Sequence, residues 1–105
     1  MDKKIDILVL LFGEVSKVLS ALSIKLLKQG KLSEDLLVKL TDYYTSHNLL
    51  IAYSTHKKNE SKAIKIAESM TNIIKDFAEI EKKKKITLKD ILSRIYKLLD
   101  ALKKS

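Results

Sequence analysis

The sequence contains no cysteine, no proline and no tryptophan, and it has only two glycines and one arginine. Without cysteine, the chain has no disulfide framework, no thiolate metal site and no thiol nucleophile. The shortage of proline and glycine removes the turn chemistry that a sheet of several short strands requires, whereas the abundant leucine, isoleucine, lysine, alanine and glutamate favour helix. These absences predict an all-α protein.

A chain of 105 residues is the right length for one domain with a single hydrophobic core, so we expect one helical domain over residues 1–105. The N-terminus begins like a signal peptide, but Asp6 interrupts the apolar stretch, and Glu14 and Lys17 follow before any small-residue cleavage site. The uncharged run over residues 7–12 is far shorter than the about 20 residues that span a membrane. We expect mature, cytoplasmic protein, with peripheral membrane contact favoured over a span.

The apolar side chains of the first segment alternate at spacings of three and four residues, which predicts a helix over about 3–29. They are Ile5, Leu8, Phe12, Val15, Leu19, Leu22 and Leu26. Gly30 then supplies a left-handed stop, and Ser33 is a good N-cap for a second helix over about 34–56. So short a loop predicts an antiparallel hairpin.

The second helix has an apolar side that is lost after Tyr53, because every residue from 54 to 62 is polar. That side carries Leu36, Leu37, Leu40, Tyr43, Tyr44, His47, Leu50 and Ile51. A third apolar face, out of phase with the second, comprises Ala63, Ile66, Met70, Ile73, Phe77 and Ile80. We therefore predict a break near residues 56–61, with Asn59 capping a third helix over about 60–82. Since neither glycine nor proline marks this break, one continuous helix from Glu34 to about Lys82 is the alternative.

A fourth helix over about 88–103 is predicted by a regular apolar face made of Leu88, Leu92, Ile95, Leu99 and Leu102. Thr87 is its expected N-cap, and Asp90 completes a pair like a capping box. Four amphipathic segments with short connections indicate an antiparallel four-helix bundle. If the second and third helices were continuous, the chain would instead complete its core with a second copy.

The first two turns of the first helix are apolar on every side, because Leu10 projects almost opposite to the core-facing side chains. A helix end of this kind is normally buried on every side. The cover is either the other helices of the same chain, a second copy or partner helix, or a membrane or membrane-active protein. Contact beyond the chain is slightly favoured, and its expected residues are Ile7, Val9, Leu10, Leu11 and Ile24.

No group of side chains has the pattern of a catalytic, cofactor-binding or metal site. His47 lies on the apolar side of the second helix, where a core histidine bonded to a tyrosine or a backbone carbonyl is favoured over a ligand. His56 follows nine residues later, which places it on the opposite side of a regular helix, so the two do not chelate one metal ion. Ser46 and His47 point about 100° apart, which argues against a catalytic triad. We expect a non-enzymatic protein without a cofactor.

The net charge of +8 is concentrated in the second half of the chain. Residues 1–53 carry seven basic and six acidic side chains, whereas residues 54–105 carry fourteen and seven. The candidate patch for an anion or nucleic acid comprises Lys57, Lys58, Lys62, Lys82, Lys83, Lys84 and Lys85. A single arginine and the lack of interleaved aromatic residues make nucleic-acid binding the alternative hypothesis.

The bias toward lysine, isoleucine and leucine, and stretches such as EVSKVLSALSIKLLKQGKLSEDLL, resemble small soluble helical proteins of AT-rich bacterial genomes and their prophages. Among these, the chain is similar to the haemolysin or holin accessory proteins, of the Bly type, of spirochaete plasmid prophages. The resemblance implies a soluble accessory whose partner is a small membrane-active, holin-like protein. The leading hypothesis is a non-catalytic helical adaptor that self-associates or binds a partner helix.

Overall fold

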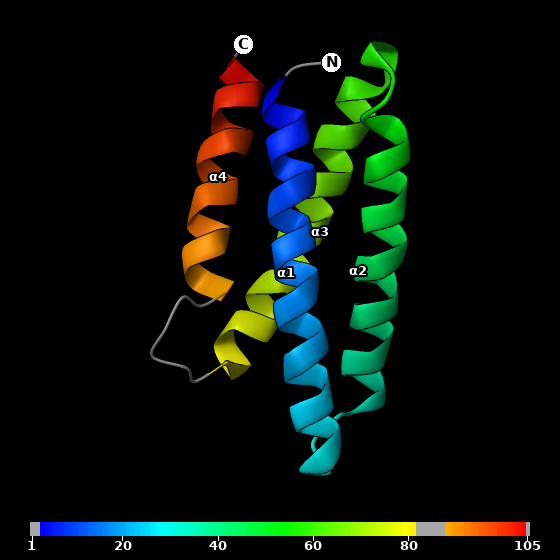
Figure 1. The fold of residues 1–105 in the computed structure, drawn as a ribbon, viewed down its shortest axis with the longest axis vertical. Helices are drawn as coiled ribbons and strands as arrows, with labels where there is room; N and C mark the ends of the chain where they lie inside the picture. The colour runs from blue at the N-terminus through cyan, green and yellow to red at the C-terminus, as the bar shows by residue number, and fades with distance from the viewer. Residues whose placement is uncertain (1–2, 82–87, 105) are drawn as a thin grey trace.

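The computed structural model describes residues 3–81 and 88–104 as helices joined by short connections. The helices are α1 (Lys3–Lys28), α2 (Glu34–Tyr53), α3 (Glu60–Ile80) and α4 (Leu88–Lys104), with a 3₁₀ turn, η1 (Lys57–Asn59), before α3. They run alternately down and up the molecule (Figure 1). The predicted all-α, antiparallel four-helix bundle is confirmed.

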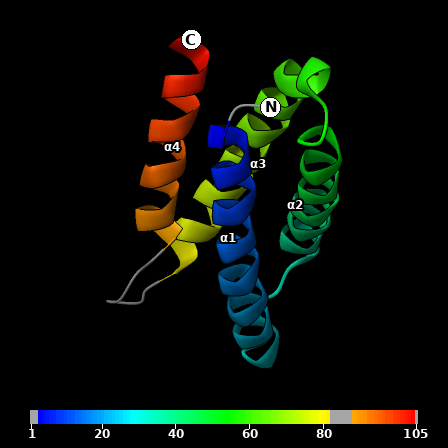
Figure 2. The same ribbon diagram turned by 45° about the horizontal axis from the view of Figure 1, so that its top comes forward.

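The two central helices are α1 and α3, and α2 and α4 flank them on opposite sides (Figures 1 and 2). Both central helices pack against each of the other three. The molecule is flattened, with extents of 43 × 25 × 16 Å. Because α3 lies behind α1, the opposite side of α1 is left at the surface.

The buried residues of all four helices form one hydrophobic cluster, as expected of a single domain. Every predicted core residue of the first and fourth helices is buried. On α3, however, Ile66, Ile73 and Ile80 are only partly buried, while Ala67 and Ile74 fill the core. The predicted face of α3 was therefore partly wrong: the buried side is turned toward Ala67, Thr71, Ile74 and Ala78, and a pattern of large apolar side chains does not select alanine and threonine.

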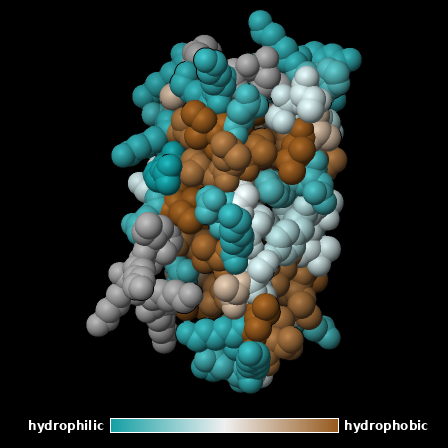
Figure 3. All heavy atoms as spheres, viewed as in Figure 1, coloured by the Kyte–Doolittle hydropathy of each residue, from teal (hydrophilic) through white to brown (hydrophobic). Residues whose placement is uncertain are grey.

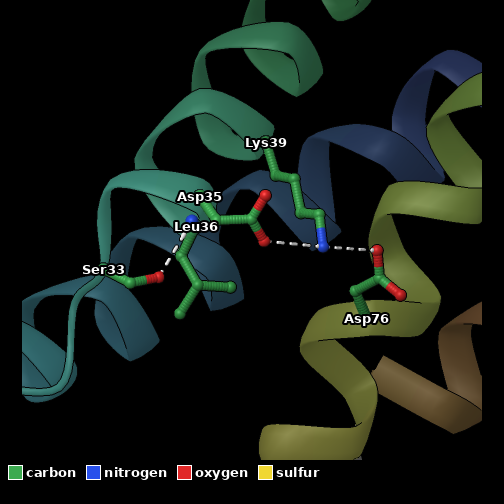
Figure 4. Close-up of polar contacts among 5 residues, drawn as sticks. All are labelled: Ser33, Asp35, Leu36, Lys39 and Asp76. Atoms are coloured by element: carbon green, nitrogen blue, oxygen red, sulfur yellow. Dashed lines mark hydrogen bonds and ion pairs between the residues drawn. The ribbon is translucent and has the colours of Figure 1, made fainter.

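Both predicted signals in the first connection are present. Gly30 has a φ of 68°, and a Schellman motif closes α1: Lys31 N–H donates to the Leu26 carbonyl at 2.8 Å, and Gly30 N–H to that of Leu27 at 3.1 Å. Ser33 Oγ accepts a hydrogen bond of 3.2 Å from the backbone N–H of Leu36 (Figure 4). These caps set the tight hairpin between α1 and α2.

A lysine bridge joins α2 to α3 just beyond this hairpin. Lys39 Nζ lies 3.0 Å from Asp35 Oδ2 and 3.1 Å from Asp76 Oδ2 (Figure 4). Hydrogen bonding to Asp35, and then to Asp76, raises the pKa of the Lys39 amine. The bridge fixes the lower part of α2 against α3.

The predicted break between the second and third helices is confirmed, and the continuous helix with an intermolecular core is wrong. The second helix ends at Tyr53 and the chain turns before η1, so α2 and α3 pack side by side. Asn59 precedes α3 as predicted, but its side chain makes no capping hydrogen bond. The 3₁₀ turn replaces that cap, since the Lys57 carbonyl accepts the N–H of Glu60.

The fourth helix begins at Leu88, as predicted. The expected N-cap Thr87 lies outside the described residues. Glu81 Oε1 accepts a hydrogen bond of 2.7 Å from the backbone N–H of Leu88. A carboxylate from the end of α3 thus satisfies one of the free N–H groups at the start of α4.

Candidate interaction surface

Large apolar side chains that remain exposed are concentrated on α1 and α2. They are Ile7, Leu10, Ile24 and Leu27 on α1, and Leu37, Val38, Leu49 and Ile51 on α2. Figure 3 shows apolar atoms above and below a paler, weakly polar centre on the side of the molecule where these two helices meet. At about 100° per residue, Val38 and Leu49 lie about 100–160° around α2 from Leu37 and Ile51, on a different side of the helix. We call the outward sides of α1 and α2, with the other six residues, the α1–α2 face.

The predicted interface residues divide between this face and the core. Leu10 is 71% exposed, and Ile7 and Ile24 are also exposed. Val9 is half-buried against the core, and Leu11 is only 5% exposed. Leu11 lies on the same side of the helix as the core-facing residues one turn away, so its own chain covers it. Leu11 is therefore corrected from an interface residue to a core residue.

Sequence reasoning missed three residues of the face. Leu27 received no role, and Leu37 and Ile51 were expected on the apolar side of α2 but are 47% and 43% exposed. The available signal was the heptad spacing of Leu37, Tyr44 and Ile51, which places the three on one edge of the helix. Whether that edge faces the core or the solvent depends on where α1 packs.

Two tyrosines set the register of α2 against α1. Tyr43 Oη donates a hydrogen bond of 2.6 Å to the Phe12 carbonyl oxygen, and burial raises the pKa of this hydroxyl. Tyr44 Oη lies 2.9 Å from Ser20 Oγ and donates to the Ser16 carbonyl at 3.4 Å. Tyr44 therefore lies level with the middle of α1.

His47 makes a further polar contact between α2 and α1, nearer to the start of α1 than those of the two tyrosines. It is half-buried, with Nε2 3.4 Å from the Val9 carbonyl oxygen and its ring stacked on Tyr43 at a centroid distance of 6.2 Å. This is the arrangement predicted for a core histidine. Over residues 3–81 and 88–104, no group of three or more His, Cys, Asp or Glu residues is placed to hold a metal ion, and no buried side-chain N or O atom lacks a hydrogen-bond partner. The interior polar groups serve packing and register.

Three lysines of the predicted basic patch lie close to the start of α3, within the described residues. Lys57, Lys58 and Lys62 are exposed near its start, where Lys62 Nζ lies 5.8 Å from the centroid of the Tyr53 ring. The other four lysines of the predicted patch, residues 82–85, lie outside the described residues.

A groove of about 560 Å³ lies between α3 and α4, and several of its charged groups have partners within the chain. Lys103 Nζ lies 3.1 Å from Glu68 Oε2, and Lys75 Nζ lies 5.3 Å from the centroid of the Tyr96 ring. Charged side chains therefore border the groove. It offers no apolar surface comparable to the α1–α2 face.

By length and composition alone, α1 is long and apolar enough to cross a membrane. The core helix of a soluble protein and a signal sequence meet the same criterion. In this bundle the core-facing side of α1 is buried against the other three helices, as in a water-soluble protein.

Comparison of the chain with protein-family models, with curated proteins and with solved structures finds no match.

Proposed function

We propose that this chain is a non-catalytic helical interaction protein that self-associates or binds a partner helix through the α1–α2 face. The observation that carries the proposal is the 71% exposure of Leu10 within a face that exposes five other large aliphatic side chains. Groups of exposed large apolar side chains on the surface of a small protein typically mark a site of protein or membrane contact.

The energy available from this face is moderate. The exposed parts of the four α1 side chains together equal about two fully exposed leucines, and covering them contributes about 3–6 kcal/mol per copy. Association itself costs about 4–15 kcal/mol. We therefore expect a reversible complex of modest affinity.

The resemblance to prophage haemolysin and holin accessory proteins favours one version of this proposal. In that version the partner is a small membrane-active, holin-like protein, and the chain acts in the cytoplasm or at the membrane surface. The amphipathic partner helix would lay its apolar side on the exposed residues of α1 and α2.

The test is light scattering behind size exclusion, from micromolar to millimolar protein, together with binding to detergent micelles and liposomes. We expect the wild-type mass to rise with concentration, and the variant Leu10→Glu/Ile24→Glu to remain monomeric with unchanged unfolding. Ser93→Glu adds a charge to an exposed position of α4 and should behave as wild type. A wild-type chain that stays monomeric and binds neither micelles nor liposomes would overturn the proposal.

A second candidate function is binding of nucleic acid or another polyanion at the basic end of the bundle. The observation in its favour is the exposure of Lys57, Lys58 and Lys62 close together at the α2–α3 connection. Binding of this kind weakens steeply between about 50 and 200 mM salt and should be reduced by Lys57→Glu/Lys58→Glu. Absence of DNA and RNA binding at low salt would eliminate it.

A further inference from the structure

The outward side of α1 has a symmetric pattern of side chains centred on Lys17, so that it could pair with a second, antiparallel copy of itself. Seven exposed or half-buried residues, spaced by three or four positions, lie within an arc of about 80° at about 100° per residue: Asp6, Leu10, Gly13, Lys17, Ala21, Ile24 and Lys28. Residues at equal distances before and after Lys17 correspond to one another: Gly13 to Ala21, Leu10 to Ile24, and Asp6 to Lys28. Small groups thus match small groups, apolar groups match apolar groups, and the acid matches a base.

The adjacent edge of α2 repeats this arrangement at the same height. Tyr44 is held level with the middle of α1 by its contacts with Ser16 and Ser20. Leu37 and Ile51 lie seven residues to either side of Tyr44 on the same edge, and both are exposed. Each helix therefore presents apolar side chains above and below one polar centre, and Figure 3 shows that centre.

Gly13 supplies an independent observation. A helix is less stable with glycine than with alanine at an interior position. A Cβ built at Gly13 would nevertheless meet no atom within 4 Å, so the chain has room for alanine there. The fold of a single chain thus gives no packing reason for glycine at this position. Close approach of another backbone from outside does give one.

We propose that a second copy of this chain packs on the α1–α2 face with its α1 antiparallel, about a two-fold axis at the level of Lys17. Leu10 then lies against Ile24 of the second copy, Gly13 against Ala21, and Asp6 against Lys28. The two α2 helices bring Leu37 of each copy toward Ile51 of the other. The inference rests on the proposed function and names its partner.

Charge selects this orientation over the parallel one. A parallel pair would place Asp6 on Asp6 and Lys28 on Lys28, whereas the antiparallel pair places each on its opposite charge. At the axis, Glu14 Oε1 lies 3.6 Å from Lys17 Nζ in each chain, so two neutral ion pairs meet there. A self-complementary surface of this kind is what an isologous dimer requires and what an unrelated partner helix does not.

Introduced thiols test the arrangement directly, because the chain has no cysteine of its own. Under mild oxidation, a mixture of Leu10→Cys and Ile24→Cys chains should cross-link at least tenfold faster than either variant alone. In the antiparallel pair the two positions 10 lie about 21 Å apart, far beyond disulfide reach, and so do the two positions 24. Faster cross-linking of Leu10→Cys with itself would show a parallel pair and overturn the proposal.

A charge exchange provides the second test, with the dimer dissociation constant as its readout. Asp6→Lys and Lys28→Asp should each weaken the dimer about two- to tenfold, and the double variant should return toward wild type. The two residues lie about 33 Å apart along one helix, so this rescue does not arise within a single chain. The control Asp6→Lys/Lys25→Asp should show no rescue, because Lys25 is not one of the seven residues on the outward arc of α1.

The outcomes separate this inference from the proposed function. A dimer that is lost in Leu10→Glu/Ile24→Glu but shows neither the mixed cross-link nor the charge rescue would overturn the antiparallel pair and leave the proposed function standing. A wild-type monomer that binds micelles or liposomes would do the same. A wild-type monomer that binds neither would overturn both.

Discussion

Tyr43 Oη, buried between α1 and α2, donates a hydrogen bond of 2.6 Å to the carbonyl oxygen of Phe12, thirty-one positions earlier in the chain. The two rings meet edge to face at a centroid distance of 6.5 Å. The Phe12 carbonyl also accepts a hydrogen bond of 2.9 Å from Ser16 Oγ. Polar contacts therefore specify how α2 lies on α1, in addition to apolar packing.

Tyr43→Phe should lower the free energy of unfolding by about 1 kcal/mol at neutral pH, because it deletes one buried hydrogen bond and keeps the ring. Urea unfolding measures this, and the slope with denaturant should not change. Tyr96→Phe, at an exposed ring of α4, is the matched control and should leave stability unchanged. Equal effects of the two substitutions would contradict a structural role for the Tyr43 hydroxyl.

The same hydroxyl should make stability depend on pH in the alkaline range. Burial raises the pKa of Tyr43 above its ordinary value of 10.0. Above that ordinary value the unfolded chain has lost the proton that the folded chain keeps, so the contribution of Tyr43 is full below about pH 10 and falls as the pH rises further. The difference in unfolding free energy between wild type and Tyr43→Phe should be constant from neutral pH to about pH 9 and then shrink. A difference that stays constant to about pH 11 would contradict this assignment.

The parts of the fold that the sequence predicted are those where one helix face meets one core. On α1 and α4 the spacing of three and four residues selects a single stripe, and that stripe is buried. On α3 large apolar residues occur beyond the buried side, and the choice between Ile73 and Ile74 depends on where the neighbouring helices pack, which a helical wheel does not contain. The hydrogen bonds of Tyr43 and Tyr44 to α1 depend on the register between helices and have no local sequence signal.

The candidate surface was predictable to a similar extent. Leu10 and Ile24 were recognised because each is an apolar residue opposite the core stripe of its own helix. Leu11 was misassigned because its exposure depends on how closely the neighbouring helices cover the edge of the stripe. Leu37 and Ile51 were assigned to the core because they border it, and only the packed position of α1 shows that they remain exposed.

Gly30→Ala should destabilise the protein by about 1 kcal/mol. Gly30 has a φ of 68°, which an L-residue adopts only at a cost, and the Schellman motif holds it in that conformation. Thermal and urea unfolding of the isolated variant give the measurement. Gly30→Asn is the control, because asparagine tolerates the left-handed region better than alanine and should recover part of the loss. A stabilised Gly30→Ala protein would show that this turn relaxes to a different conformation.

Gly13→Ala should have effects of opposite sign on folding and on self-association. In the separate chain the added methyl group meets open space and removes the helix penalty of glycine, so the free energy of unfolding should rise by about 0.5–1 kcal/mol in dilute protein. In the antiparallel pair the same methyl group lies between the two α1 helices, opposite Ala21 of the second copy. It holds the two backbones apart, so the dimer should weaken. Unfolding at low concentration and sedimentation at high concentration measure the two effects separately. A variant that gains stability without losing affinity would place the closest approach of the two α1 helices somewhere other than Gly13.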